Sequence, residues 1–394
     1  MANTLTNLIP SLYAGLDTVS REATGYIPAV HRDTTADRAA VGQAVTYPIA
    51  PAGAGVNITP AMAIPEPADQ TIGNGSITIT KARAYPFGFV GEERLGLDNN
   101  GAGFSRVQSD MFAQAVRGIV NEIEADIAAA AAAGASRAWG TPGTLPFLTN
   151  TNDVSQLGKI LTDNGAPMSD RNLVLNTTAG ASLRTLYGIN TDRDWSSRPF
   201  NERGVLATPH NMAVRETGQS VSHTGGTAAG ATTNDVGYAV GATTITLASA
   251  GTGAIEAGDV ITFAGDSHQY VVVTGDGAVG GGGTVVLQEP GLRQAIGGAE
   301  TAITVVNDGG SPTVEDYDVA GVAFYRNAIV LAARAPALPE EGDAAIDSMM
   351  MIDQNSGLPL EIRVYAAYRK VRYEVACAWG VDVPQPRHTA LLIS

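Results

Sequence analysis

Cysteine and aromatic residues are scarce in this sequence of 394 residues, in which aromatics make up 6%. The single cysteine, Cys377, rules out an internal disulfide bond, and a reducing compartment is the simplest interpretation. Cys377 lies in an apolar, strand-like run, which predicts a buried and inert thiol. The N-terminus has no basic segment followed by a long apolar stretch, so neither a signal peptide nor a membrane span is expected.

Positive charge is scarce as well. The chain has three lysines, Lys81, Lys159 and Lys370, no basic run, and a formal net charge of −15. A protein that binds nucleic acid through charge needs clustered Lys and Arg side chains. The chain is therefore not expected to hold DNA by bulk electrostatic attraction.

Motifs that would support catalysis or metal binding all fail on their sequence context. The GxGxxG match at Gly275–Gly280 stands between two strand-like runs, whereas a dinucleotide site needs a helix after its glycines. Neither a phosphate-binding loop nor a GxSxG elbow occurs, and the five histidines are far apart. Two groups of carboxylates lack the ligand spacing of a calcium loop: Glu315, Asp316 and Asp318, and Glu340, Glu341 and Asp343. We expect no enzyme activity, no metal and no cofactor.

The residues that are abundant favour strands and extended segments over a helical bundle. Hydrophobic residues make up 44% of the chain, the mean hydropathy is +0.04, and there are 46 glycines and 20 prolines. Such a chain can bury a sizeable core, and its length exceeds what one compact core usually needs.

The N-terminal part of the chain predicts an arm followed by a long β-excursion. Residues 1–45 begin with a short amphipathic helix over about 6–20 and read as an arm rather than a core element. Residues 46–90 contain a Pro, Ala and Gly-rich stretch and then an alternating strand. In that strand Ile77 and Ile79 share one face. Such an excursion cannot bury both faces within its own chain, which implies a partner surface.

The clearest helix is predicted over residues 102–134. Apolar residues recur there at intervals of three or four, and Gly134 is a natural stop. The predicted stripe is Phe104, Val107, Met111, Ala115, Ile119, Ile123 and Ile127. A helix of this length extends roughly 45 Å, which suits a spine.

The C-terminal part predicts an α/β domain that a β module interrupts. Residues 150–216 alternate helical and strand-like runs. Residues 217–312 are rich in Gly, Thr, Val and Ala, with strand candidates in quick succession, which is typical of a small barrel or sandwich. Residues 313–394 return to the earlier composition, and insertions are tolerated where chain ends lie close together.

The order of these elements resembles the Hong Kong 97-type capsid fold of tailed bacteriophages. Three stretches are similar to coat proteins of short-tailed Salmonella phages of the P-twenty-two type: GATTITLAS with IEAGDVITFAG (241–265), AFYRNAIVLAARAPALP (323–339), and RKVRYEVACAWGVDVPQPRHTALLIS (369–394). The resemblance spans nearly the whole chain, and the ordered set of segments carries it.

This resemblance implies an α+β fold of the Hong Kong 97 type with an inserted antiparallel β-barrel. The implied regions are an N-terminal arm (1–45), an E-loop (46–90), a peripheral domain (91–149) with the spine helix 102–134, the first part of an axial domain (150–216), the insertion domain (217–312), and the second axial part with peripheral strands (313–394). In relatives, a loop early in the insertion domain reaches another capsomer, and its counterpart here is near 224–238.

The implied function is that of a major capsid protein in the icosahedral head of a tailed phage. Its partners would be other copies of itself in hexamers and pentamers, a scaffolding protein, a portal protein, a decoration protein where one is used, and packaged double-stranded DNA without sequence-specific binding. The location would be the virion, assembled in the host bacterial cytoplasm, with no membrane contact. Two rivals are a secreted or surface glycan-binding adhesin, disfavoured by the missing signal peptide and disulfides, and a hydrolase of unfamiliar type.

Assembly contacts are expected from residues near the β-excursion, the spine helix and the insert. Glu92, Glu93 and Arg94 form either a solvated charge cluster or an anchor to a neighbouring subunit. The full set is Lys81, Arg83, Glu92, Glu93, Arg94, Arg106, Asn234 and Asp235. Some relatives of the fold crosslink covalently through a Lys near the E-loop tip. Since no Lys occurs between residues 46 and 80, we expect a non-covalent shell.

Overall fold

The structure is a computed structural model of the chain. It describes residues 22–34, 38–49, 58, 60, 72–99, 103–189, 209–307, 315–353 and 356–394. The predicted helix over residues 6–20 lies outside this part. The described residues form a mixed α+β structure. Its α-helices are α2 (Gly91–Asn99), α3 (Phe104–Ala133), α4 (Asn152–Asp163) and α5 (Thr177–Ile189).

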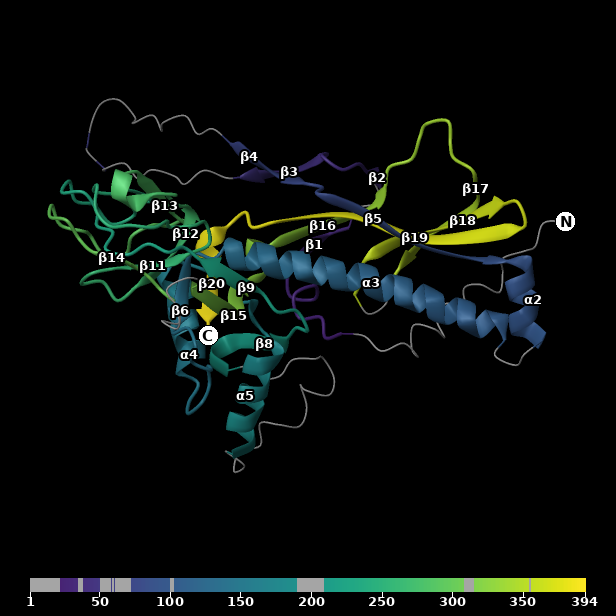
Figure 1. Cartoon of the computed structure of the whole chain (residues 1–394), viewed down its shortest axis with the longest axis horizontal. Coiled ribbons are helices and arrows are strands. Elements are labelled where there is room, and N and C mark those ends of the chain that lie inside the picture. The colour runs from purple at the N-terminus through teal and green to yellow at the C-terminus, as the bar shows by residue number, and fades with distance from the viewer. Residues whose placement is uncertain are drawn as a thin grey trace.

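A long helix lies across a mostly antiparallel sheet (Figure 1). The order in this sheet is β1-β16-β19-β18-β17, with β2 paired to β16 and β5 paired to β19. Its strands are β1 (His31–Asp33), β2 (Arg38–Ala39), β5 (Lys81–Val90), β16 (Val330–Pro336), β17 (Ala345–Ile352), β18 (Pro359–Ala367) and β19 (Lys370–Asp382). The helix is α3, and its buried face packs on β5 and β19 in the main core.

The helix predicted over residues 102–134 is present as α3, with a shifted apolar face at its N-terminal end. Ala115, Ile119, Ile123 and Ile127 are buried as expected. Near the start, Phe112 is buried and Met111 is half-buried. Phe112 is drawn inward because its ring makes edge contacts with the rings of Phe87 and Tyr373.

A second sheet joins the α4 and α5 region to a β-rich region. Its order is β10-β13-β12-β6-β20-β15-β7-β8, and β9, β11 and β14 pair off this path. Its strands are β6 (Arg137–Gly140), β7 (Arg171–Leu175), β8 (Met212–Glu216), β9 (Ser222–Gly225), β10 (Thr244–Thr246), β11 (Val260–Phe263), β12 (Gln269–Thr274), β13 (Thr284–Leu287), β14 (Ile303–Val305), β15 (Glu315–Tyr325) and β20 (Thr389–Ile393). The described residues outside 226–306 are called the body below.

The β-rich region, defined as residues 226–306, has its own hydrophobic core of side chains that include Ile245, Phe263, Val285 and Leu292. The strand candidates expected in quick succession are present as β10 to β14. The Gly275–Gly280 motif lies between antiparallel strands β12 and β13, so the expected loop is confirmed. The independently packed part begins at residue 226, since β9 pairs with β15 before it.

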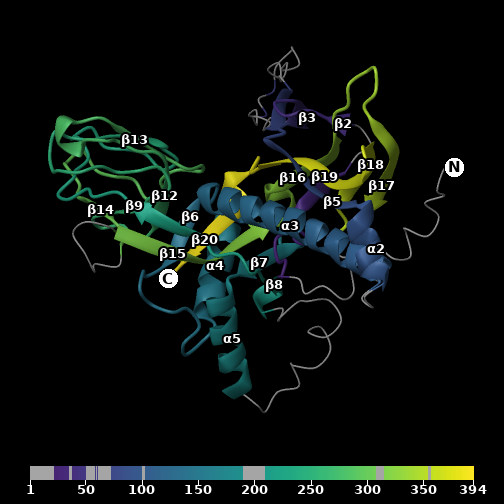
Figure 2. The same cartoon turned by 45° about the vertical axis from the view of Figure 1, so that its right-hand side comes forward.

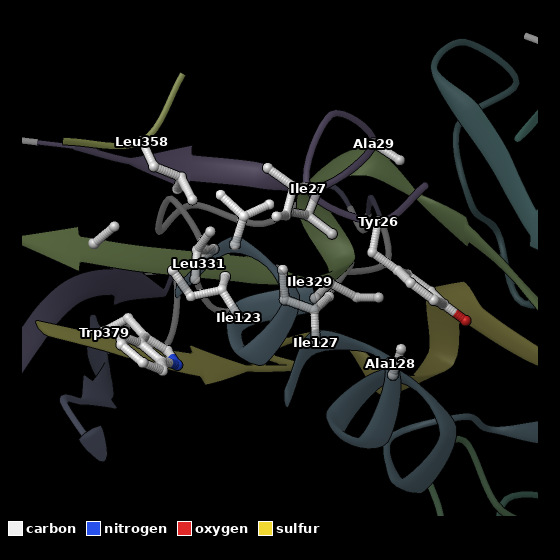
Figure 3. Close-up of a cluster of buried hydrophobic side chains, with 14 of the residues drawn as sticks. Tyr26, Ile27, Ala29, Ile123, Ile127, Ala128, Ile329, Leu331, Leu358 and Trp379 are labelled. Carbon is white, nitrogen blue, oxygen red and sulfur yellow. The ribbon is translucent and has the colours of Figure 1, made fainter. Parts of the chain in front are cut away.

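The N-terminal segment contributes to the core, in contrast to the expectation that residues 1–45 form an arm. Tyr26, Ile27, Ala29 and Val30 are at most 2% exposed. Figure 3 shows Tyr26 and Ile27 among Ile123, Ile127, Ile329 and other buried side chains. The following strand β1 pairs in parallel with β16. Burial of these apolar side chains, which sequence periodicity did not indicate, holds the segment in place.

The buried carboxylate of Glu124, in the middle of α3, anchors this segment. Its Oε1 accepts hydrogen bonds from the backbone N–H of Gly25 (2.6 Å) and Tyr26 (2.8 Å) and from the Thr217 hydroxyl (2.9 Å). Its Oε2 accepts from Ile27 N–H (3.0 Å). Burial raises the pKa of Glu124, and the four donors act in the opposite direction. One carboxylate thus connects the N-terminal segment, α3 and the residue after β8.

Removing this carboxylate should destabilise the chain. In Glu124→Ala the three backbone donors lose their acceptor, so we expect the free energy of unfolding to fall by about 3 kcal/mol. Urea denaturation followed by circular dichroism measures it. Gln114→Ala, at an exposed position of the same helix, is the control and should stay within about 0.5 kcal/mol of the unmodified chain. Equal stabilities of the two variants would contradict the anchoring role.

Candidate functional site

The candidate site starts from a two-stranded ribbon that projects from the first sheet. Strands β3 (Ala44–Ile49) and β4 (Gly73–Thr78) pair with each other from Ala44↔Thr78 to Ile49↔Gly73. This pair, called the arm ribbon below, forms a sheet of its own within the described chain. Figures 1 and 2 both show it apart from the rest of the body beyond its root.

The root of the arm ribbon is fixed by burial on one face. Ile77 and Ile79 are at most 2% exposed and pack with Ala332 and Ala378, while Thr78 and Thr80 are exposed, as the alternation predicted. The backbone just after the ribbon also lies close to that of β19, where the N–H of Thr80 donates to Trp379 O (3.0 Å). The root is therefore rigid, whereas Thr46, Pro48 and Ser76 face outward along the ribbon.

Two predicted contact residues, Lys81 and Arg83, lie just past the root and bind α3. Lys81 Nζ lies 2.7 Å from Asp126 Oδ1 and 3.5 Å from Glu122 Oε1. Arg83 Nε donates to Glu122 Oε1 (2.9 Å). The hydrogen bond to Asp126 raises the pKa of Lys81, which keeps it as an ammonium. These cations therefore set the angle between β5 and α3 within the chain.

A second group, Glu92, Glu93 and Arg94, lies at the other end of β5 on helix α2. Glu93 Oε2 accepts the N–H of Val90 (2.9 Å). The guanidinium of Arg94 stands 4.8 Å from the centre of the Phe104 ring, which is a cation–π contact between α2 and α3. Glu92 is exposed, as is Arg106 on α3. The group thus combines internal supports with surface charges.

The third group lies in the β-rich region. Asn234 Oδ1 accepts the Tyr238 hydroxyl (2.6 Å), and that hydroxyl oxygen accepts the N–H of Thr246 (2.8 Å). Asp235 is exposed beside Val236, which is 73% exposed. The predicted residues therefore do not form one site. They lie in three separate groups: near the ribbon root, on α2 with the start of α3, and on the β-rich region.

The sequence did not predict one exposed apolar surface, which lies on strand β17. Strand β17 forms an edge of the first sheet, and Ile346, Met350 and Ile352 on it are 63%, 47% and 67% exposed. Exposed apolar edges of this kind are normally covered or paired. The run AIDSMMMI is apolar at too many positions to reveal which face is outward, so periodicity did not indicate it.

Potential chemistry is sparse in the described residues. Ser155 Oγ and His210 Nε2 lie 3.1 Å apart, with Ser155 half-buried and His210 exposed. Within the described residues no carboxylate orients the His210 ring, as a catalytic triad requires. No group of three His, Cys, Asp or Glu residues in that part could hold a metal ion. Cys377 is buried, as predicted, and burial raises the pKa of its thiol to about 12.

No described helix is long and apolar enough to cross a membrane.

The Asp126 carboxylate should be important for the ribbon root. It accepts from both Lys81 Nζ and the Trp379 indole N–H (2.8 Å), and Trp379 is fully buried. Asp126→Ala should lower the free energy of unfolding by about 1–2 kcal/mol because the indole N–H loses its acceptor. Asp126→Asn keeps an acceptor oxygen and should lose less. Urea denaturation measures both, with the exposed Asp347→Ala as control; an Asp126→Ala value equal to that control would refute the role.

Comparisons with known proteins give structural likeness only. No protein-family model and no curated protein matches the chain. The capsid structure of cyanophage P-SCSP1u is similar at 11% identity with a TM-score of 0.48, covering 95% of this chain and 89% of that one. The head structure of Helicobacter pylori bacteriophage KHP40 follows at 10% and 0.45, covering 96% and 92%. A structure from Mycobacterium phage Che8 is similar at 12% and 0.44, covering 95% and 92%. Likeness at this identity and score is no argument for a shared function.

Proposed function

We propose that this chain is a major capsid protein that assembles with copies of itself into the icosahedral head of a tailed bacteriophage. The observation that carries the proposal is the arm ribbon. Its root is buried and hydrogen-bonded, yet beyond the root its described strands pair only with each other. A rigidly mounted, otherwise unpaired ribbon is expected where a neighbouring copy supplies the missing surface.

The arrangement of the described elements supports the Hong Kong 97-type assignment made from the sequence. The arm ribbon takes the place of the E-loop, α3 that of the spine helix, and the first sheet that of the peripheral domain. The body around α4, α5, β7 and β20 takes the place of the axial domain. The β-rich region is proposed as the insertion domain, because it has its own core.

Assembly would rest on several weak contacts per subunit. The exposed members of the three groups are proposed as contacts, together with the apolar edge of β17; they are Arg83, Glu92, Glu93, Arg94, Arg106 and Asp235. Single exposed ion pairs contribute about 0–1 kcal/mol. A closed lattice repeats them in every subunit, so their sum stabilises the shell while each contact stays reversible during assembly.

The proposed partners follow from this role. A scaffolding protein and a portal protein would direct shell closure, and packaged double-stranded DNA would fill the interior without sequence-specific binding. The net charge of −15 gives no attraction between DNA and this wall, so packing would need a motor. A decoration protein, where one is used, would bind the assembled shell.

Assembly is tested by electron microscopy of the chain produced with and without a scaffolding partner. We expect uniform closed shells. A variant in which Asn-Gly replaces residues 50–72, joining β3 directly to β4, should fold to the same helix and strand content but form no shells. Persistent monomers of the unmodified chain under every condition, scaffolding partner included, would refute the proposal.

The shell is expected to be held without covalent bonds between subunits. Residues 46–80 contain no lysine, and Lys81 Nζ is paired with Asp126 and Glu122 on α3 of its own chain. Particles boiled in SDS should therefore migrate as a single band of monomer mass on a gel. A ladder of multimers that persists in reducing agent would show crosslinking and overturn this prediction.

A further inference from the structure

The chain enters and leaves the β-rich region through a narrow neck of two strands. On entry it forms β9, and on return it forms the first residues of β15. These strands pair from Ser222↔Asp318 to Gly225↔Glu315. Figure 2 shows them side by side between the body and the β-rich region. The register of β15 with β20 shifts between Val319 and Gly321, directly below the neck. Such a shift bends a strand, so the neck meets the body at a point of flexure.

A buried carboxylate joins this neck to the β-rich region. Asp259, in the turn before β11, is fully buried. Its Oδ1 lies 2.8 Å from His223 Nε2 on β9 and accepts the N–H of Gly226 (3.0 Å). Its Oδ2 accepts the N–H of Glu256 (2.7 Å). A buried carboxylate needs such partners, so movement of β9 away from this turn would leave Oδ1 without its His223 and Gly226 partners.

The returning strand makes a matching contact. Tyr317, directly opposite His223 in the β9–β15 pair, donates its hydroxyl to Gly258 O (2.7 Å). The two rings stand 5.2 Å apart. Gly258 has φ +98°, and a Cβ there would come within 2.8 Å of the His223 ring. Both neck strands therefore contact the same turn, Glu256–Asp259. The His223 ring lies so close to Gly258 that only glycine fits at that position.

The other described contacts between the β-rich region and the body lie around a short strand pair. Val260 and Val271 are buried in the main core, and Arg387 Nη2 lies 3.6 Å from Glu289 Oε2. Strand β12 pairs with β6 at two residue pairs, Gln269↔Ala138 and Tyr270↔Arg137. The Gln269 amide donates to Gly140 O (2.9 Å). Together with the neck, these contacts define one orientation, whereas the contacts around β6–β12 alone would act as a pivot.

We propose that His223, Asp259 and Tyr317 form a lock that holds the β-rich region at one angle to the body, and that opening the lock lets this region swing about the β6–β12 pair. The lock acts within a single chain. It does not depend on the proposed function, and an assembled shell would add contacts to it.

The test measures the angle directly in the full-length chain. Spin labels are placed at Val240→Cys in the β-rich region and Lys159→Cys on α4, both exposed positions, in a Cys377→Ala background. Labelled chain is diluted in unlabelled chain so that only distances within one copy contribute. Pulsed electron resonance should give one narrow distance peak. His223→Ala and Tyr317→Phe, alone and together, should broaden it or add a second peak.

The matched control is a second His–Asp pair inside the β-rich region. His268 Nδ1 lies 2.6 Å from Asp266 Oδ1. His268→Ala removes a contact of the same chemistry away from the neck, and the narrow peak should remain. A peak unchanged in the His223→Ala and Tyr317→Phe double variant overturns the proposal, as does equal broadening in His268→Ala.

A second measurement covers the case in which His223→Ala does not fold. Tyr317→Phe removes one hydroxyl and should fold, so its distance distribution then decides. Hydrogen exchange at the Gly226 and Glu256 amides, which donate to Asp259, should accelerate about tenfold in that variant because the lock opens more often. Unchanged exchange at both amides, with an unchanged distance peak, would overturn the proposal.

Discussion

The hydrogen bonds to Glu124 join parts of the chain that are almost one hundred positions apart in sequence. A carboxylate in the core is tolerated only where donors surround it, so the N-terminal segment, α3 and Thr217 must take up their positions together. The fit extends to the backbone. A Cβ on Gly25 would come within 2.8 Å of Glu216 O and 2.7 Å of Val174 Cγ1. The first sheet also depends on this anchor, because β1 continues from the same segment and pairs with β16.

Elements with a strong period were predictable from the sequence, whereas residues held by distant partners were not. The α3 helix and strands β10 to β14 follow from apolar spacing and turn residues, which are local properties. Residues 22–33 have no such pattern. Their burial depends on α3 and on β16, which lies about three hundred positions further along the chain. The role of Glu124 was hidden for the same reason, since its donors are backbone groups.

The candidate contact residues illustrate a related limit. A charged residue next to a projecting ribbon can serve a neighbouring molecule or its own helix, and sequence alone does not separate the two. Lys81 and Arg94 turn out to contact α3 and Phe104 within the chain, while Glu92, Arg106 and Asp235 remain on the surface. The contacts of Lys81 and Arg94 within the chain fix the orientations of the ribbon and of α2 relative to α3. Those orientations would determine where the exposed charges meet another copy.

Strand β15 is shared by the neck and the body. Its first residues pair with β9, and Gly321–Phe324 lie between β7 and β20 in the middle of the second sheet. A pull on the β-rich region along this strand therefore reaches the body as shear. The hydrogen bonds on both sides of Gly321–Phe324 would have to slide together instead of opening one after another. The β-rich region is thus mounted so that it can turn sideways at the neck and yet resist being drawn out lengthwise.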